Sequence, residues 1–356
     1  MTTIESPWQR ALRFCCPLLT VLWMIAPANG HAAAPGDAPI PLEDWNAYQR
    51  KFVRDNGRVV DDANGEISHS ESQGYGLLLA YLAGDRAGFE RIWTFTRLEL
   101  LIRDDGLAAW KWDPAASPHV TDINNASDGD LLIAYALGLA GRAWKIPNYL
   151  TAGRKIARAL GGAAVKREGG RVLLMPAVEG FDREDRPDGP VVNVSYWIFE
   201  AFETMRWLAP ETDWPDVTKS GLSLVDAFAQ EGKVIPDWTS LRGEPSAAAG
   251  FDPVLGYNAI RVPLYLLRAG LADRSRVAPV YEAWKNGVGV LDAKTGRTTI
   301  PLPEPGYRML QASLACALDG VPVPDDLLRF EPTLYYPSTL YLLARSTIAG
   351  RYPQCL

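Results

Sequence analysis

Apolar residues follow a helical pattern along most of the chain. From Glu71 onward they recur at i, i+3, i+4 and i+7, in stretches separated by short clusters of Gly, Pro and Asp. The pattern predicts close to a dozen helices, near residues 42–54, 71–83, 86–102, 128–144, 147–160, 194–208, 217–230, 257–271, 275–286, 307–318, 323–329 and 336–348.

Strand signals are sparse by comparison. Residues 57–60, 163–166 with 171–174, and 297–300 are short β-type runs that we expect to form small hairpins on loops. Helices without parallel strands between them predict an all-α architecture. No linker divides residues 35–356 and no exact repeat occurs, so we expect one domain whose helices pair in a closed ring. Loops and helix starts meet at one concave end of such a ring.

The first 34 residues differ from the rest. Two arginines precede an apolar run at 14–28, and alanines at 32–34 supply the small residues that a signal peptidase reads. A membrane anchor is the alternative, but prolines interrupt the run and it is shorter than the roughly 20 residues that span a bilayer. We therefore expect a cleaved signal peptide at 1–34, a mature domain at 35–356, and a secreted or periplasmic protein.

Charge and cysteine usage narrow the function classes. The formal net charge is −6 and no Lys/Arg stripe is present, which argues against nucleic acid as a partner and leaves neutral polymers open. Three histidines without CxxC or HExxH spacing give little support for a metal site. After signal removal two cysteines remain, Cys316 and Cys355. The sequence does not decide whether they form a disulfide or stay as two buried thiols.

Carboxylates stand at the starts of two predicted helices. Glu71 lies in the segment 68–76, and Asp128 and Asp130 open the apolar helix at 128–144. Each carboxylate could simply belong to a capping box at its helix start. Ser68 or Ser70 would supply the cap of the first helix, and Ser127 that of the second. The functional interpretation is that Glu71 and Asp128 face one cleft, since two acids on separate helices are what cleavage of a glycosidic bond needs.

Aromatic and polar loop residues supply candidate binding groups. Trp110 and Trp112 fall in a loop, where an indole face can cover the CH-rich face of a sugar. We expect the tryptophans within helices to be core residues. Further candidates for the cleft are Asn193, Tyr196, Asp237, Trp238, Tyr257, Asn258 and Arg261. Arg261 could hold a nearby carboxylate in its charged form or form a surface ion pair.

Residues 126–144, from Ala-Ser-Asp-Gly-Asp to Gly-Arg-Ala-Trp, resemble the signature of glycoside hydrolase family 8. Five more blocks are similar to family segments in the family's order: the Glu71 segment, 110–114, 193–196, 236–238 and 257–263. The likeness is greatest to the periplasmic endo-1,4-β-glucanases associated with bacterial cellulose synthesis. It implies an (α/α)6 barrel, an inverting mechanism and a β-1,4-glucan polysaccharide bound along an open groove.

The resemblance also assigns residue roles. Glu71 matches the proton donor, and Asp128 matches the aspartate in the sugar site beside the scissile bond, where it would assist the water. Many members have Tyr-Asp where this chain has Tyr257-Asn258, and that Asp is their general base. An Asn side chain cannot accept the proton, so Asp128 or Asp252 becomes the candidate base. The two catalytic carboxyl groups should lie roughly 6.5–9.5 Å apart.

The sequence therefore predicts an exported endo-1,4-β-glucanase (cellulase) that acts as a monomer without a cofactor. One alternative is the same fold acting on xylan, chitosan or mixed-linkage glucan. The other alternative, motivated by Asn258, is a catalytically weak glucan-binding accessory of a cellulose synthase complex. A functional association with such a complex is also compatible with the predicted endoglucanase.

Overall fold

The computed structural model describes residues 39–356. The predicted signal peptide at 1–34 lies outside the described residues. Within them the chain forms eleven α-helices: α1 (Leu42–Phe52), α2 (Ser70–Leu82), α3 (Arg86–Phe95), α4 (Ser127–Ala143), α5 (Pro147–Ala163), α6 (Phe202–Leu208), α7 (Trp214–Gln230), α8 (Val262–Ala269), α9 (Arg274–Trp284), α10 (Pro305–Asp319) and α11 (Tyr335–Arg351).

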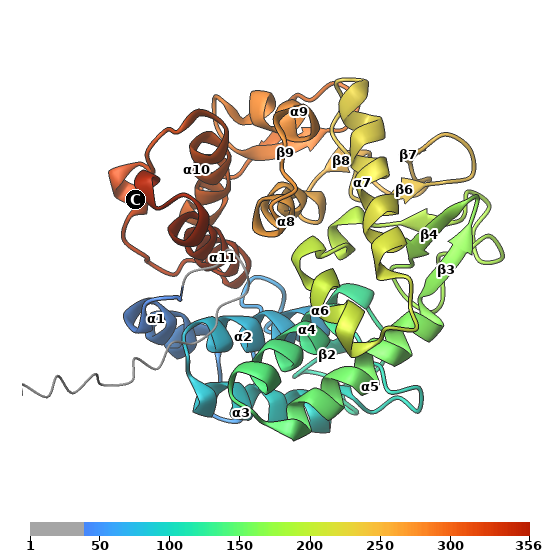
Figure 1. Ribbon diagram of the computed structural model, residues 1–356, viewed down its shortest axis with the longest axis vertical. Coiled ribbons are helices and arrows are strands. Elements are labelled where there is room, and N and C mark those ends of the chain that lie inside the picture. Colours follow the sequence, from blue (N-terminus) through green and yellow to red (C-terminus); the bar gives the residue numbers. More distant parts are fainter. Residues whose placement is uncertain (1–38) are drawn as a thin grey trace, which may run out of the picture. The chain divides into compact units, whose positions relative to one another are not determined.

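The helices form a ring with an inner and an outer layer (Figure 1). Every residue of α2 except Glu71 is buried, and α4, α8 and α11 are also mostly buried, so these helices make the inner wall. Helices α3, α5, α7 and α9 bury one face only, as amphipathic outer helices do. Contacts of α11 with both α8 and α2 close the ring. The predicted all-α barrel is confirmed.

Three predicted helices are shorter than their apolar patterns suggest. The segment predicted at 194–208 breaks into two 3-10 turns, η2 (Val194–Tyr196) and η3 (Phe199–Ala201), before α6. Between the turns, the buried Trp197 indole donates a hydrogen bond to the carbonyl of Val217, and its backbone leaves the helical region. The segment predicted at 257–271 likewise begins with a 3-10 turn, η4 (Ala259–Arg261), before α8. The segment predicted at 323–329 forms only the 3-10 turn η5 (Asp325–Leu327). A π-helical turn, η1 (Thr96–Leu100), follows α3.

The strands are short and antiparallel. The predicted hairpin is confirmed as β3 (Val165–Glu168) with β4 (Arg171–Leu174), and the strand near 297–300 is β10 (Thr298–Pro301). The strand predicted at 57–60 is wrong, because Val59 makes only an isolated bridge with Val53. The sequence pattern did not predict the remaining strands, each of two to four residues: β1 (Ser68–His69), β2 (Lys111–Trp112), β5 (Val191–Val192), β6 (Thr239–Ser240), β7 (Ser246–Ala247), β8 (Val254–Leu255) and β9 (Gly289–Asp292).

Two glycines let the starts of α2 and α4 approach closely. A Cβ added at Gly74 would lie 2.5 Å from the Leu132 Cβ, and one at Gly129 would lie 2.0 Å from the Ser70 Oγ. Both distances are far below van der Waals contact, so only glycine fits at these positions. The close approach brings the first turns of α2 and α4 side by side, and these turns carry Glu71 and Asp128.

The C-terminal end of the chain is tied to the ring. Cys316 of α10 and Cys355 of the terminal turn η6 (Pro353–Cys355) form a disulfide, which decides between the two states left open by the sequence. Across residues 39–356 we find no helix that combines the length and the apolar character needed to span a membrane.

Candidate active site

Glu71 lies in the first turn of α2, where β1 and the Trp110 loop fix the chain. Ser68 pairs with Trp112 across β1 and β2, and the Ser70 amide donates to the carbonyl of Trp110 at 3.0 Å. The helix is capped by His69, whose Nδ1 accepts the Ser72 amide at 3.0 Å, while the Ser72 Oγ accepts the His69 amide. The capping boxes expected with Ser68 or Ser70 are therefore wrong. Glu71 has no part in the cap, and its side chain is free to point elsewhere.

Arg261 joins Glu71 to Asp128. One terminal nitrogen of the guanidinium pairs with Oε1 of Glu71, and the other donates to Oδ2 of Asp128 at 2.8 Å. The Arg261 side chain is only 3% exposed, so this is a buried cluster and the surface alternative for Arg261 is wrong. Two carboxylates from different helices thus share a single cation.

The two aspartates of α4 have different environments. Burial raises the pKa of Asp128, the charge of Glu71 raises it further, and Arg261 acts in the opposite direction. Asp130 has different partners: it accepts hydrogen bonds from the Ala108 amide at 2.8 Å and from the Asn125 side-chain amide at 2.9 Å. Burial raises the pKa of Asp130 to about 7. Asp128 is the member of the pair that faces the cluster, and Ser127 makes no cap with Asp130.

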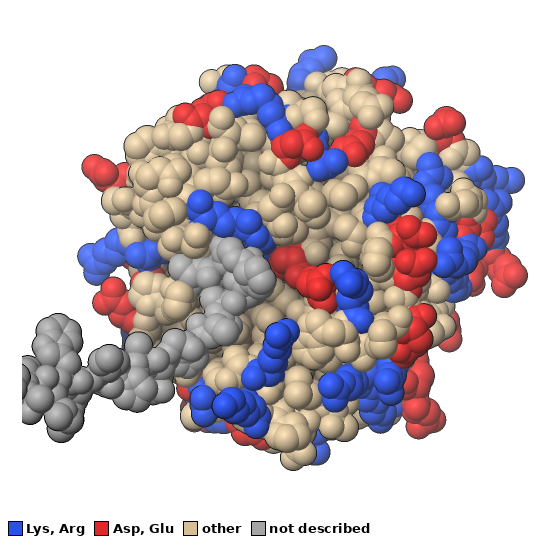
Figure 2. All heavy atoms as spheres, viewed as in Figure 1, with Lys and Arg blue, Asp and Glu red and all other residues tan. Residues whose placement is uncertain are grey.

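A cavity of about 500 Å³ opens beside Glu71 and Arg261. Besides these two, its lining includes Asp61, His69, Tyr257, Asn258, Glu304, Tyr307, Tyr335 and Tyr336. Tyr257 is half exposed, and the Tyr336 hydroxyl donates to its carbonyl at 2.6 Å. On the face drawn in Figure 2, charged side chains lie around the rim, and both acidic and basic atoms lie near the centre. Carboxyl, amide and phenol groups around one hollow match the hydroxyl-rich surface of a carbohydrate.

Asp237 and Asn193 hold backbone in place at this end of the ring. Asp237 is buried and accepts the amides of Gly256 and Ala259 at 2.8 and 2.7 Å, which fixes the turn that carries Asn258 and Arg261. Burial raises the pKa of Asp237, and these hydrogen bonds oppose the rise. Asn193 accepts hydrogen bonds from Ser195 in the turn η2. Both residues were predicted to bind substrate, and the contacts that the structure gives them are with the protein.

The predicted tryptophan platforms fall into two kinds. Trp238 is packed among three aromatic rings, with Phe181 stacked at 5.2 Å, Phe251 stacked at 4.6 Å and Tyr196 on an edge at 6.2 Å. Trp110, in contrast, is half-buried and its indole nitrogen donates to Asp122 at 2.8 Å. Lys111 Nζ lies 5.4 Å from its ring centroid, but no aromatic ring of residues 39–356 is found stacked on it. Trp110 is the better candidate for stacking on a sugar.

Trp112 lies between these two cases. Its ring is 4.1 Å from that of His119, the Arg58 guanidinium lies 4.8 Å from its centroid, and its indole nitrogen donates to Glu99 at 3.1 Å. It is therefore engaged by the protein although it remains half-buried. Tyr196, another predicted binding residue, lies 5.8 Å from the Arg261 guanidinium and so borders the cluster.

Asp252, a candidate general base, stands apart from the cluster. It is exposed in the loop before β8, and it is not part of the lining of the cavity beside Glu71. The contacts described for residues 39–356 bring Glu71, Asp128 and Arg261 together and do not bring Asp252 to them. Asn258 lines the cavity, as expected for a residue at the position of the family base.

Comparison with known proteins bears on the family and the fold of the chain. The family model "Glycosyl hydrolases family 8" matches residues 18–300. The chain belongs to glycosyl hydrolase family 8. It is 36% identical over 275 residues to a probable endoglucanase of Novacetimonas hansenii, covering 74% of this chain and 79% of that relative. As a family 8 member it is a glycoside hydrolase, and the (α/α)6 barrel implied by the resemblance holds.

Solved structures of family 8 enzymes have the same fold. The endo-beta-1,4-glucanase CMCax from Acetobacter xylinum superposes with a TM-score of 0.78 at 33% identity, covering 87% of this chain and 98% of that one. The endoglucanase Cel10 from Klebsiella pneumoniae gives 0.77 at 28% identity, covering 87% and 99%.

Sequence reasoning missed several residues of this family 8 site. Asp61 and His69 lie beside Glu71, and Glu304, Tyr307 and Tyr336 come from the C-terminal third of the chain. His69 could have been found, because it lies two residues before Glu71 at a helix start. Glu304, Tyr307 and Tyr336 carry no local signal, since only closure of the ring brings α10 and α11 next to α2, and Asp61 comes from the segment before β1.

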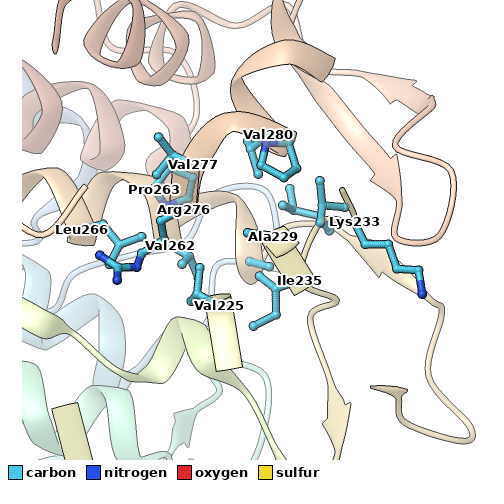
Figure 3. Close-up of a pocket in the computed structure, with 14 residues that line it drawn as sticks. Val225, Ala229, Lys233, Ile235, Val262, Pro263, Leu266, Arg276, Val277 and Val280 are labelled. Atoms are coloured by element: carbon cyan, nitrogen blue, oxygen red, sulfur yellow. The ribbon is translucent and has the colours of Figure 1, made fainter. Parts of the chain in front are cut away.

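A second pocket, drawn in Figure 3, is too small to bind a sugar. It has a volume of about 20 Å³ between α7, α8 and α9 and is lined mainly by apolar side chains such as Val225, Leu266 and Val277. A space of this size holds about one water molecule. It is a packing gap of the helix layers, and it contains none of the carboxylates of the site.

Proposed function

We propose that this family 8 hydrolase is an endo-1,4-β-glucanase that cleaves internal bonds of a β-1,4-glucan with inversion of configuration. The observation that carries the proposal is the cluster of Glu71 and Asp128 around Arg261 at the wall of an open cavity. An open cavity admits the middle of a polymer. The relatives named endoglucanase and endo-beta-1,4-glucanase, at 36% and 33% identity, support the choice of a β-1,4-glucan.

Glu71 is the proposed proton donor. It is the one residue of α2 that is not buried, and it lines the cavity from the start of that helix. In the reaction its proton passes to the glycosidic oxygen, the C–O bond breaks, and a water molecule attacks the opposite face of the anomeric carbon. No cofactor enters this scheme.

Asp128 is the proposed partner of Glu71 in the sugar site next to the scissile bond. Its Oδ2 is held by Arg261 and its Oδ1 by the Gly129 amide, which fixes the carboxylate. Asn258 lines the cavity but cannot take the proton of the attacking water. Of the two bases considered from the sequence, Asp128 lies in the cluster and Asp252 is on the surface, so Asp128 is the one we retain.

We also propose that the protein is exported and acts as a monomer in the periplasm or outside the cell. The disulfide between Cys316 and Cys355 supports an oxidising compartment. A functional association with a cellulose synthase complex rests on the family resemblance alone. N-terminal sequencing of the protein recovered from a periplasmic fraction tests the export, and a start near residue 35 is the expected result.

Release of reducing sugar from carboxymethylcellulose tests the proposed function. The wild type should release it, and Glu71→Gln should lower the rate by about 10²–10⁴-fold, the usual contribution of a general acid. Glu43→Gln makes the same chemical change on the exposed face of α1 and should retain full activity. Equal rates for the wild type and Glu71→Gln would refute the acid assignment. Release from xylan or chitosan but not from the glucan would refute the substrate.

A further inference from the structure

His69 and Asp61 extend the acid cluster on the side of Glu71 away from Arg261. The His69 Nδ1 lies 3.6 Å from Oε2 of Glu71, and its Nε2 lies 3.5 Å from Oδ2 of Asp61. All three side chains line the cavity. The two oxygens of Glu71 therefore have different neighbours, a guanidinium at Oε1 and an imidazole at Oε2.

The hydrogen bonds of His69 fix its neutral tautomer. Because Nδ1 accepts the Ser72 amide, the proton of the neutral ring lies on Nε2, where it faces the Asp61 carboxylate. The Ser72 amide occupies the single Nδ1 lone pair, so Oε2 of Glu71 meets the negative end of the ring dipole at 3.6 Å. This dipole and the Asp61 carboxylate both disfavour a charge on Oε2, and a proton on Oε2 removes the repulsion.

Arg261 distinguishes the other oxygen. A guanidinium only donates hydrogen bonds, so Oε1 of Glu71 must accept and cannot carry a proton toward it. Oε1 is therefore held by a cation, and Oε2 is the oxygen that Arg261 does not hold. We propose that Oε2 is the oxygen of Glu71 that donates to the glycosidic bond, and that Asp61 and His69 are positioning residues that keep its proton there.

Several ionisable groups face the His69 ring: Asp61, Glu71 of α2, Asp128 of α4 and the ring edge of Tyr335 of α11 at 5.8 Å. Burial lowers the pKa of His69, but the hydrogen bond with Asp61 and the nearby carboxylates outweigh burial, so its pKa is raised. A raised pKa favours the imidazolium, so the neutral ring on which the proposal depends is the form above the pKa of His69.

The proton balance of the step is simple. The Oε2 proton moves to the glycosidic oxygen, the bonding electrons leave with that oxygen, and the water that attacks the anomeric carbon gives one proton to Asp128, which later releases it to solvent. The Glu71 carboxylate takes up one proton from solvent before the next cycle. His69 is neutral before and after the reaction.

This inference rests on the proposed function of Glu71, and substrates with different leaving groups test it. The release of a sugar alkoxide needs the acid, whereas the release of 2,4-dinitrophenolate does not. His69→Asn keeps a side-chain oxygen for the Ser72 amide, as Asn is a good helix cap, and removes the imidazole. Asp61→Asn removes the negative charge that faces Nε2 and leaves a side chain of the same shape. Ser72→Ala removes part of the cap and leaves the imidazole.

For His69→Asn and Asp61→Asn we expect kcat on cellopentaose at neutral pH to fall on the order of tenfold or more, a part of the general-acid contribution, with KM unchanged. The loss should shrink as pH is lowered, because His69 of the wild type then becomes charged and no longer disfavours a charge on Oε2. Activity on 2,4-dinitrophenyl β-cellobioside should stay near that of the wild type, and Ser72→Ala should show no leaving-group dependence.

An equal loss on both substrates, or no loss on either, would overturn the inference. Glu71→Gln measured alongside separates the two proposals. Suppose that Glu71→Gln loses cellopentaose cleavage but keeps dinitrophenolate release, and that His69→Asn shows no such difference between the two substrates. The inference about His69 then fails and the acid assignment stands. If Glu71→Gln itself shows no such difference, the proposed function fails first.

Discussion

Glu71 of α2 and Asp128 of α4 bind opposite terminal nitrogens of the same buried guanidinium, that of Arg261. Each carboxylate stands in the first turn of its helix, where the positive end of the helix dipole favours a negative charge. Arg261 therefore sets both the spacing and the charge balance of the two acids.

Loss of Arg261 should be costly and dependent on pH. Arg261→Ala leaves Asp128 buried without its cation, and breaking a buried pair in this way costs about 3–5 kcal/mol of folding free energy. Since the loss of the cation raises the pKa of Asp128 further, the deficit should be smaller in acid, where the carboxyl is protonated, and larger in alkali. Urea denaturation of the wild type and variant at acid and alkaline pH measures this, and a deficit that does not vary with pH would contradict it.

The approach of α2 to α4 should depend on Gly74. A methyl group there meets the Leu132 Cβ, so Gly74→Ala should cost about 1–3 kcal/mol from overpacking and lower activity by displacing Glu71 from Asp128. Gly162→Ala in α5 is the matched control, because nothing lies within 4 Å of its added Cβ, and it should be neutral or stabilising. Thermal denaturation that finds Gly74→Ala as stable as Gly162→Ala would rule out the close contact.

Much of the fold could be predicted from sequence because helix periodicity is local. The starts of α1, α5 and α11 fall within one residue of the pattern. The break at Trp197 could not be predicted, since it depends on a hydrogen bond to Val217 in another helix. The two-residue strands β1 and β2 are likewise too short to leave a periodic signal.

The site was predictable where chemistry lies at helix starts and unpredictable where the ring closes. The sequence interpretation chose Asp128 over Asp130 as the residue that faces the cleft, although both fit a cap equally well, and in the structure Asp128 binds Arg261 whereas Asp130 binds the Ala108 amide. The packing of Trp238 against Phe181 and Phe251 was invisible, because aromatic residues in loops show the same local pattern whether they bind a sugar or one another.

Asp130 should make the protein less stable as pH rises. Its pKa is about 7 in the folded state and near 3.8 when unfolded, so the folded state binds more protons between these values. Stability then falls as pH increases from about 4 to about 7, by as much as about 4 kcal/mol if this group acted alone. Asp130→Asn should show a flatter dependence of Tm on pH, and the exposed Asp55→Asn an unchanged one. Parallel curves for all three proteins would contradict the burial argument.

Trp110 should contribute to substrate binding and Trp238 to the stability of the fold. Trp110→Ala should raise KM for cello-oligosaccharides with little change in Tm, as expected for an indole that stacks on sugar. Trp238→Ala should lower Tm, because it removes the centre of an aromatic cluster at a cost of about 3–5 kcal/mol. Steady-state kinetics and calorimetry on both variants check this, and the reverse pattern would mean that the two assignments should be exchanged.

The configuration of the first product tests the central claim most directly. In an NMR time course of cellopentaose hydrolysis by the wild type, an acid and a water acting on opposite faces of the sugar should give the α-anomer first, with the β-anomer appearing only by mutarotation. Immediate appearance of the β-anomer would show a retaining reaction and contradict the roles given to Glu71 and Asp128.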